Sequence, residues 1–292
     1  MSLRGLWMLL VLMPLAGCNG GSDRPNAAEP AVSSRVESND PNDVVLPPHR
    51  ALANNPLGLP YPETEAMAQG DHVYAVVRES LLDAALGKTL VLRLSRIVGQ
   101  EGEQLLVRQP SGVPYAIHPA YVVPLRRGRF RRRGSVLAPR GGRMTHAAVR
   151  TFRRKKIVVQ YIDVGLRLGQ RAIARNQLGI LTGALEAGGF AIFEDGPLRR
   201  HVTLVSKGTH RDGKARWLVL SYGSVATLVD HERLRRLPRT RRLKAGDEVL
   251  VAWRGLMTPG VVGKVEPSGL MAVKRPRFGG LTTAGPGMVV LR

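Results

Sequence analysis

An internal repeat constrains the fold of this 292-residue chain more than any other feature. Three aliphatic positions recur with one spacing, the second five residues after the first and the third three residues later. The pattern occurs at Ile117, Val122 and Leu125, at Ile173, Leu178 and Leu181, and at Val229, Leu234 and Leu237. Each set lies 56 residues after the one before, and Thr283, Met288 and Leu291 form a weaker set 54 residues further on. Repetition at a fixed period predicts several copies of one structural unit.

Near the start of each copy a glycine precedes apolar residues at alternate positions. The starts are residues 70–76, 133–139, 187–193 and 245–251, and Val249 and Val251 illustrate the alternation. Period-two spacing predicts a strand with one buried face. Further strands are predicted where Val, Ile, Leu and Tyr gather, at 89–97, 155–164, 215–223 and 260–274. We therefore expect an all-β protein of four tandem small barrels with about five strands each.

The predicted barrels span 67–125, 126–181, 182–238 and 239–292, and we call these ranges the first to fourth unit. Residues 78–88 of the first unit predict a short helix, because Leu81, Leu82 and Ala85 share one helical face and Gly87 can end it. A chain of about 55 residues buries only about 60% of its unfolded surface, so each unit alone would be marginal. Neighbouring units are expected to stabilise one another.

Residues 244–280 resemble a Tudor-like, SH3-like barrel. The residues that carry the resemblance are Gly246, Asp247, Val249, Val251, Trp253, Pro259, Gly260, Val262, Val265 and Val273. The match is partial in the first and third units and faint in the second. Barrels of this family hold methylated lysine or arginine in aromatic cages, and a cage here would need Trp253, Phe278 and Met257 to converge. Aromatic residues make up only 5% of the chain, so we interpret Trp253 and Phe278 as barrel core.

The first 18 residues have the layout of a secretory signal. Arg4 precedes an apolar segment, Leu6–Leu12, that is too short to span a bilayer. The final Leu15-Ala16-Gly17-Cys18 resembles the lipobox of bacterial lipoproteins. That resemblance implies removal of residues 1–17, attachment of diacylglyceryl and a further acyl group such as palmitate at Cys18, and a membrane anchor. Because Asn19 rather than an aspartate follows, it implies the outer membrane in preference to the inner one.

Residues 18–66 are predicted to be a disordered tether. After Cys18 this stretch is rich in Pro, Asn, Ser, Ala and Gly and has no apolar periodicity. Such a composition cannot bury enough surface to offset the entropy of ordering. Lipidation of Cys18 would also use the only thiol of the chain, which leaves no cysteine for a disulfide, a metal site or a nucleophile.

Positive charge is concentrated in the second unit. It holds sixteen basic residues and one acid, Asp163, whereas the first unit has no net charge and the third and fourth carry +3 and +7. The candidate anion-binding residues form two clusters: Arg131, Arg132 and Arg133, and Arg153, Arg154, Lys155 and Lys156. Arginine binds phosphate and carboxylate through paired donors, so we expect an anionic polymer or lipid headgroups as partner. A surface that is merely solvated by arginine remains the alternative.

No catalytic, metal or cofactor site is predicted. The seven histidines show no metal-ligand spacing, and no nucleophile elbow or phosphate-binding glycine loop occurs. Asp230-His231-Glu232 is the nearest acid-base cluster, and we interpret it as a solvated turn. We expect a non-catalytic, envelope-anchored binding or scaffold module. Two alternatives stay open: a nucleic-acid-binding Tudor-like protein, and an envelope enzyme with an unrecognised site.

Overall fold

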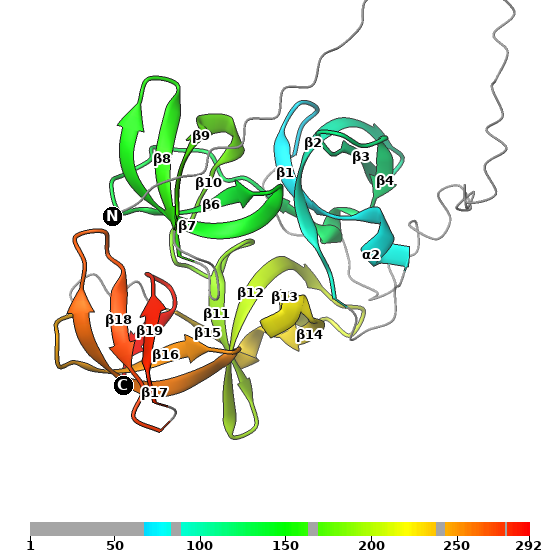
Figure 1. Ribbon diagram of the computed structural model, residues 1–292. Helices are drawn as coiled ribbons and strands as arrows, with labels where there is room; N and C mark the ends of the chain where they lie inside the picture. The colour runs from blue at the N-terminus through cyan, green and yellow to red at the C-terminus, as the bar shows by residue number, and fades with distance from the viewer. Residues whose placement is uncertain (1–66, 83–88, 163–168, 238–242, 278) are drawn as a thin grey trace, which may run out of the picture. The chain divides into compact units, whose positions relative to one another are not determined.

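The strands of the protein pair only with antiparallel neighbours. In the computed structural model, which describes residues 67–82, 89–162, 169–237, 243–277 and 279–292, they form two ten-stranded sheets (Figure 1). The all-β prediction is confirmed. Neither path of paired strands closes on itself within these residues. The division into four barrels therefore stays a prediction.

The first unit contributes five strands and two short helices. Their bounds are β1 His72–Val76, α2 Arg78–Leu82, β2 Leu92–Glu101, β3 Gln104–Arg108, β4 Tyr115–Ile117, the 3-10 helix η1 Pro119–Tyr121 and β5 Val122–Pro124. The strands pair in the order β5-β1-β2-β3-β4. Helix α2 occupies the start of the predicted 78–88 helix, and the rest of that segment lies outside the described residues.

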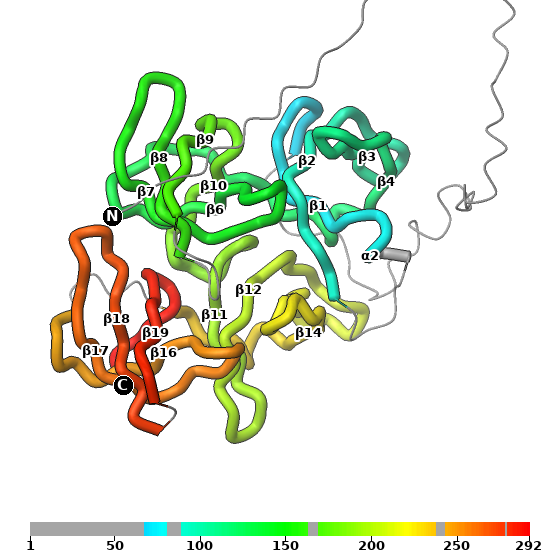
Figure 2. The backbone as a smooth tube through the Cα atoms, in the orientation of Figure 1, coloured from blue at the N-terminus to red at the C-terminus, as the bar shows by residue number. Residues whose placement is uncertain are grey.

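The second unit repeats this order of pairing. Its elements are β6 Ser135–Arg140, β7 Arg143–Arg153, β8 Lys156–Tyr161, β9 Gln170–Ala174, η2 Arg175–Gln177 and β10 Gly179–Ile180. The strands pair as β10-β6-β7-β8-β9. Figure 2 shows the long β7–β8 hairpin of this unit in green.

The third and fourth units follow the same order again. The third consists of β11 Phe190–Asp195, β12 Leu198–Thr209, β13 Ala215–Leu220, η3 Tyr222–Ser224, β14 Ala226–Asp230, η4 His231–Arg233 and β15 Leu234–Arg236. The fourth consists of β16 Glu248–Trp253, β17 Leu256–Val265, β18 Met271–Lys274, β19 Leu281–Ala284 and β20 Val289–Leu291. They pair as β15-β11-β12-β13-β14 and β20-β16-β17-β18-β19.

The second strand of every unit has a β-bulge at an equivalent position, where it pairs with the third strand. The pairing register shifts between Ile97 and Gly99, between Val149 and Thr151, between Leu204 and Ser206, and between Val262 and Lys264. An extra residue bends the strand and increases its twist. Each long second strand can therefore pair with the first strand at one end and the third at the other.

The repeated aliphatic positions have similar surroundings. Ile117, Ile173 and Val229 lie in β4, β9 and β14, and each directly precedes the N-cap residue of a 3-10 helix. In the fourth unit a turn replaces that helix, and the Met288 N–H donates to the Gly285 carbonyl at 3.1 Å. A short helical turn therefore stands between the fourth and fifth strands in three units.

Each ten-stranded sheet joins two units through one short strand contact. The Leu94 N–H of β2 donates to the Gly142 carbonyl before β7 at 2.7 Å. The His201 N–H of β12 donates to the Gly255 carbonyl before β17 at 2.9 Å. The first unit is thus paired with the second, and the third with the fourth, at equivalent strands.

The two sheets also share apolar core. Val205, Leu218 and Leu220 of the third unit are buried in one cluster with β1, β2 and β5 of the first. The Ser206 hydroxyl crosses this interface to donate to the Ala120 carbonyl at 2.6 Å. Because side chains of both units are buried together, the interface provides stabilisation that a single unit could not supply.

Two histidines flank one phenylalanine where the second, third and fourth units meet. The ring of Phe190 stacks on His146 with centroids 3.5 Å apart and lies 4.3 Å from His201. His146 Nε2 donates to the Gly188 carbonyl at 2.9 Å, and His201 Nε2 donates to the Gly287 carbonyl at 3.1 Å. Both histidines therefore tie neighbouring units together.

The predicted signal, Cys18 and the tether lie outside the described residues. Among the residues that are described, no helix is long and apolar enough to cross a membrane.

Three buried tyrosines allow a matched stability test. The Tyr74 hydroxyl is buried without a hydrogen-bond partner among the described residues, whereas Tyr115 donates to the Val76 carbonyl at 2.8 Å and Tyr161 to the Pro139 carbonyl at 2.6 Å. An unsatisfied buried hydroxyl carries an uncompensated desolvation cost. We expect Tyr74→Phe to leave the free energy of unfolding unchanged or raise it by about 1 kcal/mol. Tyr115→Phe and Tyr161→Phe should each lower it by about 1 kcal/mol.

Denaturant titrations of the three variants would measure these differences. If Tyr74→Phe destabilised the protein as much as the two controls, the Tyr74 hydroxyl would have a partner that this structure lacks.

Candidate functional site

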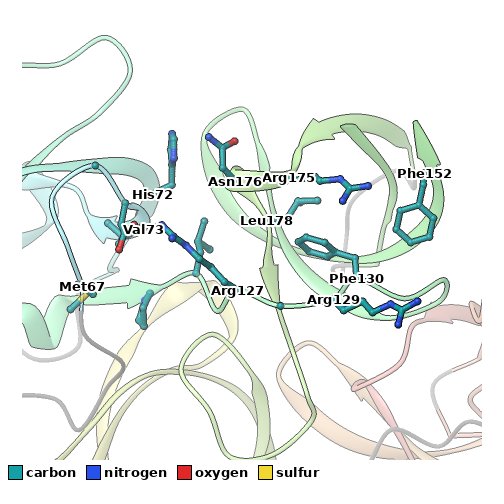
Figure 3. A pocket seen from close by; sticks show the side chains of 15 residues that line it. Met67, His72, Val73, Arg127, Arg129, Phe130, Phe152, Arg175, Asn176 and Leu178 are labelled. Atoms are coloured by element: carbon teal, nitrogen blue, oxygen red, sulfur yellow. Dashed lines mark hydrogen bonds and ion pairs between the residues drawn. The ribbon is translucent and has the colours of Figure 1, made fainter. Parts of the chain in front are cut away.

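A cleft of about 910 Å³ lies between the first and second units (Figure 3). One side is formed by β1, and the opposite side by the connection between β5 and β6, by β7 and by η2. The cleft is therefore built from segments that are far apart in the sequence. Only the folded chain brings them together.

The charged groups of the cleft are mainly arginines. Arg127, Arg129 and Arg175 line it together with one acid, Asp71. Arg127 forms an ion pair with Asp71, whose second oxygen accepts a hydrogen bond from the Ala68 N–H at 3.1 Å. Asp71 compensates only one of the three arginines, so the cleft keeps a net positive charge. An anion is the ligand that this charge attracts.

Two aromatic rings stand beside these arginines. Figure 3 shows Phe130 and Phe152 in the same part of the cleft as Arg129 and Arg175. Phe130 packs partly against the core of the second unit, whereas Phe152 has 39% of its surface exposed. An exposed ring beside guanidinium groups provides a flat apolar surface for a ring or chain that carries negative charge.

His72 adds no positive charge to the cleft at neutral pH. Burial lowers the pKa of His72 from its usual value of 6.5, and the nearby Arg96 guanidinium lowers it further. The imidazole is therefore neutral above pH 6.5, since a lowered pKa shifts its protonation to more acidic solution. The positive charge of the cleft at neutral pH therefore comes from its arginines.

The first predicted cluster, Arg131, Arg132 and Arg133, borders the cleft but does not line it. These side chains are exposed on a turn that leads into β6. Backbone hydrogen bonds fix the turn: the Arg133 N–H donates to the Val149 carbonyl at 2.8 Å, and the Gly134 N–H to the Arg131 carbonyl at 3.0 Å. The arginines therefore project from an ordered segment next to Phe130.

The second predicted cluster forms the tip of the β7–β8 hairpin. Arg153 pairs with Lys156 across the hairpin, and Arg154 and Lys155 make the turn. All four are exposed and follow Phe152 directly in the sequence. Because Phe130 and Phe152 line one cleft, the structure brings the roots of both clusters to the same place.

Sequence reasoning missed Arg127, Arg129 and Arg175 as site residues. Arg127 and Arg129 belong to the basic stretch 126–134, so a signal for them was present. Arg175 is isolated in the sequence and reaches the cleft only because η2 packs beside that stretch. Phe152 likewise gave no signal beyond its basic neighbours.

Acids compensate several arginines of the third unit, including Arg200 and Arg216, but not the predicted clusters. Arg200 pairs with Asp195 at 2.6 Å and Arg216 with Asp230 at 2.9 Å. Neither predicted cluster forms an ion pair within the described part of the chain, and the same is true of Arg129. Exposed cations held together without acids repel one another, and a bound anion relieves that repulsion.

Other candidate centres are occupied by intramolecular contacts. Asp230 pairs with Arg216, and His231 Nδ1 accepts a hydrogen bond from the Trp217 Nε1–H at 2.9 Å. Trp253 is half-buried and has the guanidinium carbons of Arg275 and Arg254 at 4.1 and 4.9 Å from its ring centre. The ring thus contacts two arginines of its own chain, and Phe278 lies outside the described residues.

No group of three or more His, Cys, Asp or Glu side chains that could hold a metal ion occurs in the described ranges.

Removal of the one acid in the cleft should strengthen anion binding. Asp71→Asn keeps an oxygen that can accept from Ala68 but releases Arg127. We expect the affinity for inorganic polyphosphate to rise about two- to fivefold, since exposed ion pairs are worth up to about 1 kcal/mol. Calorimetric titration would measure it, with Asp212→Asn in the β12–β13 turn as the control of equal charge change. Equal effects of both variants would assign the gain to overall charge instead of the cleft.

Comparison with known proteins gives no family assignment: no family model matches the chain, and no curated protein matches its sequence. Function is therefore inferred from the chemistry of the basic cleft and of the clusters beside it.

Proposed function

We propose that the protein is a lipid-anchored lipoprotein of the bacterial envelope that binds an anionic partner without catalysis. The observation that carries the proposal is the set of exposed arginines and lysines without acidic partners around Phe130 and Phe152. A bound anion would supply the missing negative charge. The rings would contact its apolar or planar parts.

We infer that the binding module consists of four small SH3-like barrels. The recurring strand order, the bulge in each second strand and the 3-10 helices before the fifth strands support this assignment. The barrels would serve as a frame that holds the basic segment 126–134 beside the β7–β8 hairpin. In this assignment the third unit contributes mainly to the shared core.

The anchor is inferred from sequence. A charged start, a short apolar segment and Leu15-Ala16-Gly17-Cys18 together support lipidation, with the outer membrane preferred. Residues 19–66 would then allow the folded part to reach a partner at some distance from the bilayer.

Nucleic acid is the second candidate partner. The exposed ring of Phe152 beside Arg129 and Arg175 favours it, because bases stack on aromatic side chains while arginines bind the phosphates. In this alternative the first residues would not be a signal, and the protein would bind nucleic acid in the cytoplasm. Nothing in the described residues favours the enzyme alternative.

The anchor can be tested by mass spectrometry of the purified protein. We expect an amino terminus at Cys18 that carries diacylglyceryl and one further acyl chain. Cys18→Ser should abolish acylation and release the protein from the membrane fraction, because several acyl chains are needed for stable anchoring. Recovery of an intact chain from Met1 in the soluble fraction would overturn the anchor and favour the nucleic-acid alternative.

Binding can be tested with the full-length Cys18→Ser protein over a salt series. The probes are inorganic polyphosphate, phosphatidylglycerol vesicles and duplex DNA. We expect the affinity for polyphosphate and vesicles to fall steeply with salt, and replacement of Arg131, Arg132 and Arg133 by Gln to weaken it at least tenfold. Each phosphate contact that is lost should also reduce the slope of log affinity against log salt by about 0.9.

The control variant replaces Arg199, Arg211 and Lys214 of the third unit by Gln, which removes the same charge from another exposed surface. Its affinities should stay within about twofold of the parent protein. Equal losses of affinity in both variants would show that the arginine cluster acts only as general surface charge. Binding that is at least tenfold tighter for DNA than for the other probes would establish the nucleic-acid alternative.

A further inference from the structure

A second cleft, of about 680 Å³, lies between the segment 129–134 and the fourth unit. Arg129 and Phe130 line both this cleft and the one in Figure 3. The remaining walls differ, because the second cleft continues to the β17–β18 hairpin and contains no part of the first unit. Its volume is in the range of small-molecule sites.

Part of the wall of the second cleft is apolar. Besides Phe130, the lining includes Val149, Ile180, Leu243, Val265, Met271 and Pro286. Met271 and Leu243 are almost fully buried, whereas Val265 has 38% of its surface exposed at the end of β17. The cleft therefore offers apolar surface, which is accessible to solvent at Val265.

Exposed arginines form another part of the lining, which we call the mouth of the cleft. Arg129, Arg131, Arg132 and Arg133 line it and form no ion pair within the described ranges. The one acid that lines it is Glu266, whose carboxylate accepts a hydrogen bond from the Ser268 hydroxyl at 3.0 Å. Four arginines against one glutamate leave the mouth positively charged.

Packing between the second and fourth units fixes the two walls. Leu270 is buried with Ala148 and Ile162 in one small cluster. A Cβ atom on Gly285 would lie 2.6 Å from the Ile162 Cβ, so the two units approach too closely there for any larger residue. The cleft is thus preformed, which reduces the cost of ordering on binding.

We propose that the second cleft binds an anionic membrane lipid, with an acyl chain along the apolar wall and the phosphate on the arginines of the mouth. The inference rests on the proposed function and names its partner class. A polymer that carries only charged groups would leave the side chains of Phe130 and Val265 in contact with water. A neutral apolar ligand would leave the arginines without a counter-charge, whereas an amphiphile with an anionic head satisfies both.

Soluble alkyl phosphates test the proposal. The full-length Cys18→Ser protein in detergent-free buffer is titrated calorimetrically with inorganic phosphate, with butyl, hexyl and octyl phosphate, and with neutral octyl glucoside. Each methylene that becomes buried should tighten binding up to about fourfold. Octyl phosphate should therefore bind at least tenfold more tightly than inorganic phosphate and than octyl glucoside.

Two variants test where the alkyl chain of octyl phosphate binds. Val265→Asn removes apolar wall without adding charge and should weaken octyl phosphate binding at least fivefold while leaving polyphosphate binding unchanged. Leu281→Asn, at a residue of the same unit that is 69% exposed and outside the cleft, is the matched control and should change neither.

The outcomes separate this inference from the proposed function. If polyphosphate binds but octyl phosphate binds no more tightly than inorganic phosphate, the lipid site is wrong and anion binding stands. The same holds if Val265→Asn has no effect or if octyl glucoside binds equally well. If none of the anionic probes binds, the proposed function itself is wrong.

Discussion

Small five-stranded units bury so little apolar surface that each alone would be only marginally stable, and this constraint explains how the protein is assembled. One backbone contact joins the first unit to the second, at Leu94, and an equivalent one joins the third to the fourth, at His201. Side chains of the third unit, such as Leu218, then complete the core of the first. The clefts between units are consequences of this association, because residues that a single unit would expose to water are brought against a neighbour.

The all-β class of fold was predictable from the sequence, because the repeated aliphatic positions occupy equivalent places within their own units. Ile117 and Val229 are buried beside equivalent turns, so their spacing was visible in the chain. The long strands β7 and β12 were not predicted. Their buried faces include His146 and His201, which break the apolar alternation and are buried because they stack on Phe190. That reason exists only once the units have assembled.

The candidate site was predictable only in part, for a similar reason. Basic clusters are visible in a sequence, but the absence of acidic partners is a property of the fold. In the third unit Asp195 and Asp230 stand opposite Arg200 and Arg216 on paired or adjacent strands, so those charges are compensated. The second unit has only Asp163, which lies outside the described residues. The composition shows an excess of positive charge in the second unit. The structure shows that this charge lies in and around a cleft lined by Phe130 and Phe152.

The chemical nature of the site also determines which solution variable controls it. Arginine keeps its charge at any pH that proteins encounter, and His72, whose pKa is lowered by burial and by Arg96, is already neutral above pH 6.5. Electrostatic attraction in the clefts therefore varies little between pH 7 and pH 9. Salt, in contrast, screens exposed charges over distances of about 10 Å at 0.1 M. An arginine site of this kind would bind an anionic partner with an affinity that falls as ionic strength rises. An apolar wall such as that at Val265 would add a part of the affinity that salt does not screen.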